Sequence, residues 1–543
     1  MVRDADETVI ARRGSAIAVI VTGVGLHTGA LGGQVTTAQY DNARTGWAAH
    51  ETVLRPGNVN PSSFGKVATL AVDGDVYAQP LFLPRVALPG AGIRGLLIVA
   101  TERNSVYAFD AASHSATPVW RVSMNQAMGA MPLDNRDVHC PFIRPDIGIT
   151  PTPVIDSASG TIYVLARTKV RTATGGFRFE QHLHALDVRS GADRRPPALI
   201  DAAVAGTGAG SQGGRLAFDP LRENPRGALL LVNGTVYLSW ASSCDVGPYH
   251  GWIMAYDAAT LVQKAVFNTT PNGAEGGIWQ SDAGLAADSS GNVYAVTGNG
   301  TFDIAAAARR DYGNTVLRLA RRDSSLIVRD FFTPSNQAAL SGQDADLGSS
   351  GPVPIPEQPG DHRRLLVVTG KDGTTYLLDR DAMGQYAVGT RTKALQAFKT
   401  SEGGFGAAAY WNHTVYIWGS LDMLKAFAIE GGKLVQRGAG ATRFTDPGAT
   451  PVVSSNGSRD GILWAVETRT WNGADKVAVL HAYDAGNVAR ELFNSEMNPG
   501  RDRAGLATRF AMPTVAAGFV YVGAKMEVDV YGLVQPHNGP ATR

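Results

Sequence analysis

The sequence predicts an all-β fold, an eight-bladed β-propeller that an N-terminal strand closes into a ring. The prediction rests on a repeated strand motif, on the near absence of long helical patterns, and on 63 glycines spread through 543 residues. A chain of this length exceeds the ~250–300 residues at which single cores usually divide. It therefore needs several domains or a fold that grows by repeating one unit.

The repeat consists of a short apolar strand, usually with Tyr or Trp near its middle, then a turn and a second strand of the type "xxAxD". The first strands are expected at 96–102, 161–167, 235–241, 292–298, 365–370, 414–420, 462–467 and 519–524. Their partners are expected at 105–111, 182–188, 252–258, 374–380, 423–429, 480–485 and 528–533. Short strands at quasi-regular spacing, separated by Gly, Ser and Asn turns, are typical of a propeller.

The two ends of the repeat region indicate how the ring closes. The last unit, at 512–533, ends without an outer strand, and the first unit is preceded by a spare strand, KVATLAVDG, at 66–74. We expect the spare strand to complete the last blade, which leaves only short, protected strand edges. The predicted plan is an N-terminal arm at 34–65, the propeller at 66–535 and a loose tail at 536–543.

The first 33 residues are typical of a secretory signal. Arg3, Arg12 and Arg13 precede a mostly apolar run from Gly14 to Leu26, and small residues follow. The run is shorter than the ~20 residues of an ordinary transmembrane helix. We therefore expect a periplasmic or secreted protein with no membrane span in the mature chain.

Charge and cysteine content exclude several classes of function. The 49 Lys and Arg against 48 Asp and Glu give a net charge of +1, so no basic face for nucleic acid is expected. Cys140 and Cys244 stand alone, with no CxxC, which leaves neither a zinc knuckle nor a haem attachment site. The two are either buried free thiols or, in an oxidising compartment, one bridge.

The repeat and two longer passages resemble the quinoprotein alcohol dehydrogenases. The passages are GGIWQSDAGLAADSSGNVYAVTGNG at 276–300 and GKDGTTYLLDRDAMG at 370–384, and the resemblance covers about residues 66–533. Members of that family are eight-bladed and bind pyrroloquinoline quinone with a calcium or lanthanide ion in a central funnel. The resemblance implies oxidation of an alcohol or sugar hydroxyl, with a separate electron acceptor because no haem-binding segment is present. Outer-membrane assembly scaffolds share the repeat.

The resemblance also implies a cofactor floor and metal ligands. Trp279 matches the family tryptophan on which the quinone stacks, and a flat conjugated ring suits a flat cofactor. Asn299 and Asp245 match the metal-binding asparagine and acidic residue, and hard oxygens of this kind suit calcium. Each also has a purely structural interpretation, a core tryptophan or a turn residue.

A further passage and the passage at 370–384 resemble the catalytic part of the family site. The loop that contains Asp344 and Asp346 stands where the family carries its catalytic aspartate, and the sequence does not choose which of the two is the general base for a substrate hydroxyl. Lys371 matches the cation beside the quinone oxygens. Its structural alternative is a lysine in an exposed hairpin turn.

The passage DVHCPFIRPDIG resembles the segment that covers the other face of the quinone. Arg144 lies near the position of a cofactor-binding arginine, and a Cys140–Cys244 bridge over the funnel would replace the family's pair of adjacent cysteines. Two positions depart from the family, since Tyr77 replaces an acidic contact and Phe405 lies where an Asn-Trp pair is usual.

The departures keep two other functions open. One is a non-catalytic propeller scaffold that binds a protein or a polysaccharide, and the other is a hydrolase or lyase with residues that no motif reveals. The substrate, the electron acceptor and the oligomeric state stay open at this level.

Overall fold

The computed structural model describes residues 33–125, 129–303, 311–387, 392–469 and 476–534. These residues belong to one compact unit, Gly32–Arg543, and they form an all-β fold, as predicted. Residues 1–32 of the predicted signal and the predicted tail at 536–543 lie outside the described residues. Among the described residues, no helix has both the length and the apolar character that a membrane crossing requires.

Most strands belong to antiparallel sheets of four consecutive strands. The first sheet contains β3 (Leu81–Leu88), β4 (Gly92–Ala100), β5 (Ser105–Asp110) and β6 (Trp120–Ser123). The second contains β9 (Val154–Asp156), β10 (Thr161–Arg171), β11 (Phe177–Asp187) and β12 (Ala198–Leu199). Later in the chain, one sheet contains β23 (Val353–Pro354), β24 (Leu365–Thr369), β25 (Thr374–Asp379) and β27 (Gln396–Lys399). The next contains β28 (Ala409–Trp411), β29 (Thr414–Trp418), β30 (Met423–Glu430) and β31 (Lys433–Arg443).

Two runs of four strands in the middle of the chain join into one larger sheet. The first run is β15 (Leu230–Val232), β16 (Thr235–Trp240), β17 (Trp252–Asp257) and β18 (Gln263–Asn268). The second is β19 (Ala286–Ala287), β20 (Val293–Val296), β21 (Val316–Arg322) and β22 (Ser325–Thr333). A parallel pairing between Val266 and Ser325 links them, and β26 (Gln385–Tyr386) adds to β22.

The last two sheets include strands from the N-terminal part of the chain. The strand β1 (Trp47–Ala48) pairs parallel with β32 (Val452–Asn456), which continues into β33 (Arg459–Glu467), β34 (Val479–Asp484) and β35 (Glu491–Asn494). The strand β2 (Phe64–Ala71) pairs antiparallel with β38 (Glu527–Leu533), next to β37 (Phe519–Ala524) and β36 (Thr514–Ala516).

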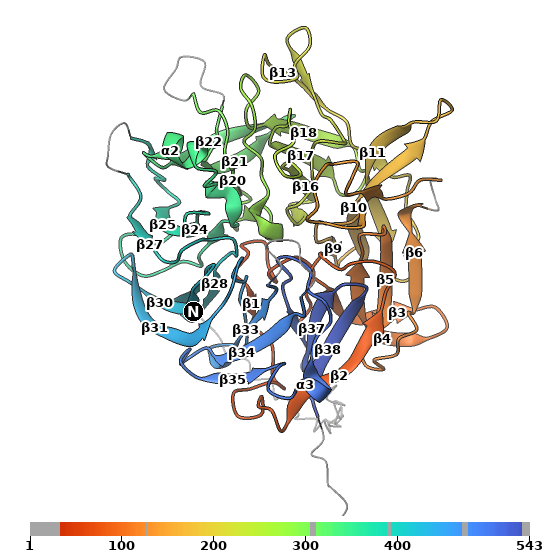
Figure 1. Ribbon diagram of the computed structural model, residues 1–543, viewed down its shortest axis with the longest axis vertical. Helices are drawn as coiled ribbons and strands as arrows, with labels where there is room; N and C mark the ends of the chain where they lie inside the picture. The colour runs from red at the N-terminus through yellow and green to blue at the C-terminus, as the bar shows by residue number, and fades with distance from the viewer. Residues whose placement is uncertain (1–32, 126–128, 304–310, 388–391, 470–475, 535–543) are drawn as a thin grey trace, which may run out of the picture. The chain divides into compact units, whose positions relative to one another are not determined.

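The remaining elements are small. Two hairpins are β7 (Leu133–Asp134) with β8 (Asp146–Ile147) and β13 (Ala203–Ala205) with β14 (Arg215–Ala217). The helical elements are α2 (Gln337–Gly342), α3 (Pro499–Asp502), η1 (Gln280–Asp282) and η2 (Leu347–Ser349). Figure 1 shows the sheets following one another in chain order around a common centre within this unit.

The predicted strand pairs coincide with the second and third strands of these sheets. The segment expected at 235–241 is β16, for example, and its partner at 252–258 is β17. Both strands are buried along nearly their whole length because neighbouring sheets cover both of their faces, and doubly covered strands read as continuous apolar runs. The outer strand β18 is partly exposed and carries a weaker apolar signal.

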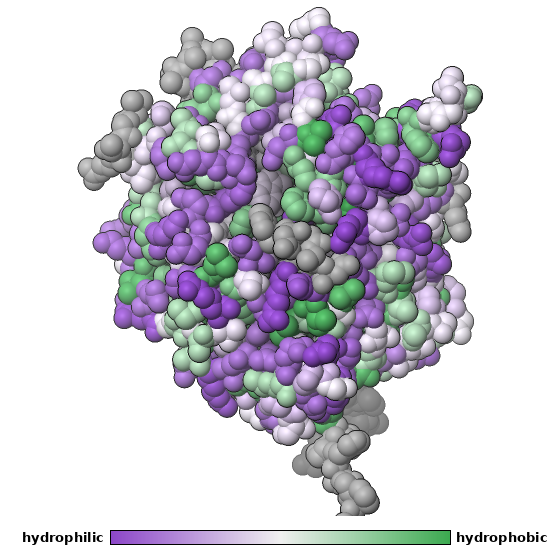
Figure 2. All heavy atoms as spheres, viewed as in Figure 1, coloured by the Kyte–Doolittle hydropathy of each residue, from purple (hydrophilic) through white to green (hydrophobic). Residues whose placement is uncertain are grey.

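The hydrophobic core is divided among the interfaces between neighbouring sheets. One cluster combines Leu365 and Val367 of β24 with Val415 and Ile417 of β29. Figure 2 shows hydrophilic residues spread across the displayed face, with hydrophobic residues scattered between them.

Residues 34–51 of the predicted N-terminal arm at 34–65, which alone are called the arm from here on, hold together the strands that come first in each run of four. We call these the leading strands (β3, β9, β15, β19, β23, β28, β32 and β36). The arm forms hydrogen bonds to all of them except β23. Its partners are Phe82 in β3, Ile155 in β9, Leu231 in β15, Ala287 in β19, Tyr410 in β28, Val453 in β32 and Val515 in β36. One short segment can reach all of these strands only because they converge.

Arg44 is the central residue of the arm and is completely buried. Its guanidinium donates to the carbonyl oxygens of Leu285, Leu229 and Ala38 at 2.9, 3.0 and 2.8 Å, and to Thr37 Oγ1 at 2.6 Å. Burial lowers the pKa of Arg44 to about 10, so the side chain stays charged at neutral pH. The planar donor fork thus connects the arm to two neighbouring runs of strands.

We expect Arg44→Met to lower the free energy of unfolding by about 3 kcal/mol or more, because four buried acceptors lose their donor. Urea denaturation followed by circular dichroism measures the change. Arg55→Met is the control, since Arg55 is exposed on the same N-terminal segment. Equal midpoints for the two variants would show that the arm does not hold the leading strands.

A buried charged group lies within the sheet of β33, β34 and β35. His481 Nδ1 is 2.7 Å from Glu491 Oε1, and its Nε2 is 3.8 Å from Glu467 Oε2. Burial lowers the pKa of His481, but hydrogen bonds to Glu467 and Glu491 outweigh that effect and raise it above the ordinary value. Burial raises the pKa of Glu467, but bonds from His481 and Arg469 outweigh it and lower the pKa to about 2.

These opposite shifts predict a pH window for stability. A raised histidine pKa stabilises the fold below the unfolded value of about 6.5, and the contribution is lost as pH rises through the folded pKa. A lowered glutamate pKa stabilises it above about 4.5, and that contribution is lost as pH falls. We expect urea midpoints of the parent to decline from about pH 6.5 upward, and His481→Gln to flatten the decline. His139→Gln, at an exposed histidine, serves as control, and parallel pH curves for all three proteins would contradict the assignment.

Candidate functional site

A cavity of about 250 Å³ lies among loops of several sheets and contains most of the residues that the sequence singled out. The predicted residues in its wall are Cys140, Cys244, Asp245, Trp279, Asp344, Asp346 and Lys371. Residues that the sequence did not single out include Phe142, Arg226, Arg509 and Phe510. The cavity is therefore lined by aromatic, acidic and basic side chains together with a disulfide.

The lining residues come together because antiparallel strands alternate in direction. Lys371 lies in the turn between β24 and β25, and Asp245 in the loop between β16 and β17, the second and third strands of their runs. Trp279, Asp344 and Arg509 lie in connections from the fourth strand of one run to the leading strand of the next. The chain reverses at each strand, so turns after second and fourth strands lie at the same end.

Three aromatic rings pack together at one side of the site, and two of them, Trp279 and Phe510, line the cavity. The ring centroid of Trp279 is 6.2 Å from that of Phe405 and 6.3 Å from that of Phe510, and the two phenylalanines are 6.2 Å apart. The position where the family carries an Asn-Trp pair thus holds a ring, Phe405, that packs against the predicted cofactor floor. A planar ligand would gain favourable contact from such a surface.

Lys371 lies between the two candidate bases. Its Nζ is 2.7 Å from Asp344 Oδ2 and 3.5 Å from Asp346 Oδ2. Asn299 supports both carboxylates, because its backbone N–H donates to Asp346 Oδ1 at 2.8 Å and its Nδ2 donates to Asp344 Oδ1 at 2.9 Å. The loop that contains Asp344 and Asp346 and the turn that contains Lys371 therefore form one contiguous polar cluster.

Asp346 is the buried member of the acidic pair. Its residue is 9% exposed, whereas Asp344 is exposed. Burial raises the pKa of Asp346, and Lys371 and the Asn299 N–H partly oppose that effect. A Cβ at Gly298 would lie 2.3 Å from Asp346 Oδ1 and 3.4 Å from Trp279 Nε1, so only glycine lets the backbone pass so close to both.

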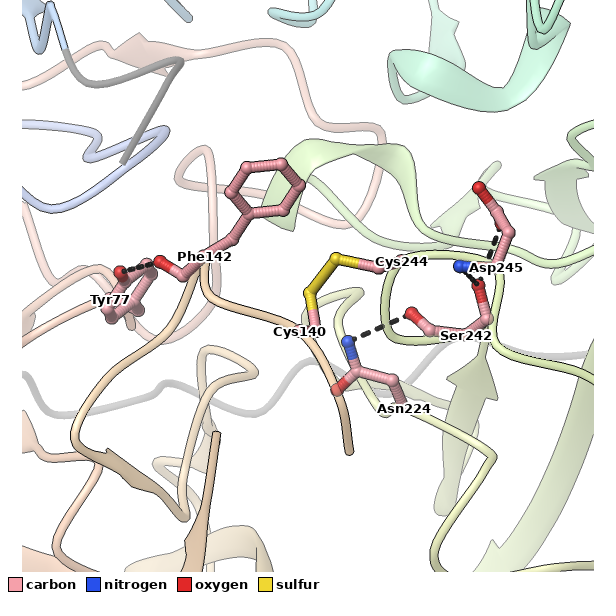
Figure 3. Close-up of a disulfide and its surroundings, with 7 residues drawn as sticks. All are labelled: Tyr77, Cys140, Phe142, Asn224, Ser242, Cys244 and Asp245. Atoms are coloured by element: carbon pink, nitrogen blue, oxygen red, sulfur yellow. Dashed lines mark hydrogen bonds between the residues drawn. A yellow bond between two sulfur atoms is a disulfide. The ribbon is translucent and has the colours of Figure 1, made fainter. Parts of the chain in front are cut away.

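The disulfide Cys140–Cys244 lies in the cavity wall beside Asp245 (Figure 3). It joins the loop before β8 to the loop after β16, with the two Cα atoms 5.5 Å apart. Cys244 and Asp245 both have positive φ, a backbone conformation that residues other than glycine seldom adopt. Ser242 Oγ and Tyr249 Oη each donate to Asp245 Oδ1 at 2.9 Å, which orients the carboxylate.

Two predicted site residues are not part of the wall. Arg144 is exposed and does not line the cavity, whose arginines are Arg226 and Arg509. Asn299 lies behind the wall, where it contacts the acidic pair. No sequence signal identified Arg226 or Arg509, because each is a single arginine in an interstrand loop without a surrounding motif.

The structure gives less support to the predicted metal pair. Among the described residues, no group of three or more His, Cys, Asp or Glu side chains is arranged to hold a metal ion. The Asn299 amide donates to Asp344 and accepts from Asn314 Nδ2 at 3.2 Å. Asp245 and Asn299 therefore have other partners, although Asp245 and Asp344 both raise the pKa of Asp346, so the carboxylates lie within electrostatic range of one another.

Comparison with solved structures shows which known fold this chain has. The structure is similar to the quinohemoprotein alcohol dehydrogenase of Comamonas testosteroni, with a TM-score of 0.60 and 13% identity over 92% of this chain and 80% of that one. It is also similar to the quinohemoprotein alcohol dehydrogenase ADHIIG of Pseudomonas putida HK5, with a TM-score of 0.59 and 14% identity over 94% and 82% of the two chains. A europium-containing methanol dehydrogenase gives a TM-score of 0.54 and 14% identity over 92% and 98%. No protein-family model and no curated protein matches the chain.

The chain has a quinoprotein-type propeller fold. The family resemblance inferred from the repeat is thus confirmed at the level of the fold, at identities too low to carry the activity across. In this propeller most of the residues singled out in separate passages of the sequence line one cavity.

We expect replacement of both cysteines by serine to lower the free energy of unfolding by about 2–4 kcal/mol, because the bridge closes a loop of about 100 residues in the unfolded chain. Urea denaturation of the variant, and of the parent with and without reductant, measures the effect. A mass spectrum of a non-reduced digest should contain the linked Cys140 and Cys244 peptides. Two free thiols in that digest would refute the bridge.

Proposed function

We propose that this chain is an exported, eight-bladed quinoprotein-type propeller that oxidises an alcohol or sugar hydroxyl. The eight runs of four strands, the last completed by β2, support the blade count and the closure by an N-terminal strand. The disulfide supports export, because such bridges persist in oxidising compartments. The acceptor of the electrons would be a separate molecule.

One observation carries the proposed activity. Trp279, Asp344, Asp346 and Lys371, chosen from three passages of the sequence, all line the same cavity. The same wall includes the disulfide, in line with the expectation of a bridge over the funnel. An aromatic floor, a cation and a buried acid in a concave site are what a planar, polar, electron-accepting cofactor requires.

The residues present fit pyrroloquinoline quinone. Trp279 would supply the stacking face, and Lys371 would supply positive charge beside the cofactor oxygens. The role proposed for Arg144 has less support, because that residue is exposed. Bound here, the cofactor would supply the acceptor for the hydride of an alcohol carbon.

The contacts favour Asp346 over Asp344 as the general base. Asp344 is the closer partner of Lys371, at 2.7 Å against 3.5 Å for Asp346, and most of its side chain is in solvent. Asp346 is buried and its pKa is raised, which makes its carboxylate a better proton acceptor. Asp346 would take the hydroxyl proton of the substrate, while Lys371 and the Asn299 N–H hold the carboxylate in place.

The calcium or lanthanide ion that the resemblance implies would be held by Asp245 and Asn299. In the structure both residues hydrogen-bond to other protein groups, Asp245 to Tyr249 and Asn299 to Asp344 and Asn314. Titration with and without Ca²⁺ or La³⁺ tests this part of the proposal separately.

We expect calorimetric titration of the parent with pyrroloquinoline quinone to give saturable binding that Trp279→Ala abolishes. Trp279→Phe is the matched control, because it keeps an aromatic face and should retain most of the affinity. Loaded parent should then reduce an artificial electron acceptor when alcohols are added, and Asp346→Asn should lose that activity while still binding the cofactor. If the quinone does not bind, with or without Ca²⁺ or La³⁺, the proposal of an oxidoreductase is refuted. The alternative, a non-catalytic propeller that binds a protein or a polysaccharide, is then favoured.

A further inference from the structure

The proposed oxidation gives no role to two arginines of the cavity wall, Arg226 and Arg509. Arg226 precedes β15 and is 8% exposed, and Arg509 precedes β36 and is 5% exposed. Both line the cavity that contains Trp279. They come from distant parts of the sequence, and the fold brings both to one cavity.

The two guanidinium groups are held against aromatic rings. Arg509 Cζ is 3.8 Å from the ring centroid of Phe142, and Arg226 Cζ is 5.0 Å from that of Phe510. Arg509 Cζ also lies 6.0 Å from the Phe510 centroid, so the two arginines share one ring. A guanidinium stacked on a ring keeps its N–H edge directed sideways, in the fork that matches a carboxylate.

The cavity has two electrostatic neighbourhoods. Tyr77 donates to the carbonyl oxygen of Phe142 at 3.1 Å, and Arg509 stacks on the ring of the same Phe142. Burial raises the pKa of Tyr77, and Arg226 and Arg509 are among the charged groups that act on it. Asp346 instead lies 3.5 Å from Lys371, which also contacts Asp344. The arginines therefore lie beside Tyr77 and Phe142, and the candidate base lies beside Lys371.

We propose that Arg226 and Arg509 form a carboxylate-binding end of the cavity, which takes a planar aromatic ligand bearing at least one carboxylate and orients its opposite edge toward Asp346 and Lys371. The inference deepens the proposed function and rests on it for the identity of the cavity. Aromatic rings supply the flat walls, two fixed forks supply anion recognition, and the separation of the arginines from the acidic pair supplies polarity. The arginines would thus decide which edge of the ligand meets the base.

Calorimetry on the full chain tests the inference with three probes. These are pyrroloquinoline quinone, its uncharged trimethyl ester, and trimesate, a planar benzene ring that carries carboxylates but no quinone. We expect Arg226→Gln and Arg509→Gln each to weaken quinone and trimesate binding about tenfold or more, since each loses charge-assisted hydrogen bonds. The trimethyl ester should bind the parent weakly and should not respond to either substitution.

Arg136→Gln is the matched control, because that arginine is mostly exposed and pairs with Asp134 outside the cavity. Thermal unfolding of each variant verifies that it folds. Arg226→Lys should recover only part of the affinity, since lysine restores the charge but not the fork. If the glutamine variants do not fold, the comparison of the acid and its ester on the parent decides.

The outcomes separate this inference from the proposed function. If trimesate binds and depends on both arginines while the quinone does not bind, the carboxylate end stands and the quinone function fails. If the quinone binds and depends on Trp279 but is indifferent to both arginines, the function stands and the carboxylate end is refuted. Equal binding of the acid and its ester to the parent, or no binding of either acid, also overturns the inference.

Discussion

The structure depends on the hydrogen bonds between the N-terminal arm and the leading strands. The arm gives backbone and side-chain hydrogen bonds to leading strands from Phe82 to Val515. Arg44 adds a buried charge that donates to oxygens of the arm and to the carbonyl oxygens of Leu229 and Leu285, which precede β15 and β19. The arm thus links leading strands that lie far apart along the chain.

The arm and the cavity occupy different parts of the centre. Arg226 and Phe510 line the cavity, and a few residues later Leu231 and Val515 bond the arm. No residue of the arm lines the cavity. The arm therefore bonds to the leading strands themselves, whereas candidate site residues such as Arg226 and Phe510 lie in the loops that precede these strands. Loops can vary their side chains without altering the constraint, which is how one fold supports different functions.

The strands predicted from the sequence agree best with the structure where both faces of a strand are buried. The central strands, such as β16 and β17, are continuous apolar runs and were predicted, whereas the outer strand β18 is partly exposed and was not. For the site, Trp279, Asp344, Asp346 and Lys371 were singled out because they stand in passages with a recognisable motif, and all four line the cavity. Arg226 and Arg509 were not singled out, since a lone arginine in a loop carries no pattern, and the predicted Arg144 does not line the cavity.

By itself the sequence determined the all-β class, the repeat and the passages that resemble a quinone site, because these depend on local periodicity and on short motifs. Only the tertiary structure decided which side chains share a cavity, since neighbours there come from different loops, such as Cys140 and Cys244, which are 104 residues apart. It brought Cys140 to Cys244, gave Asp344 and Asp346 different surroundings, and placed Phe405 beside Trp279. Such contacts follow from the convergence of strands on the arm, a long-range property that no segment of the chain encodes alone.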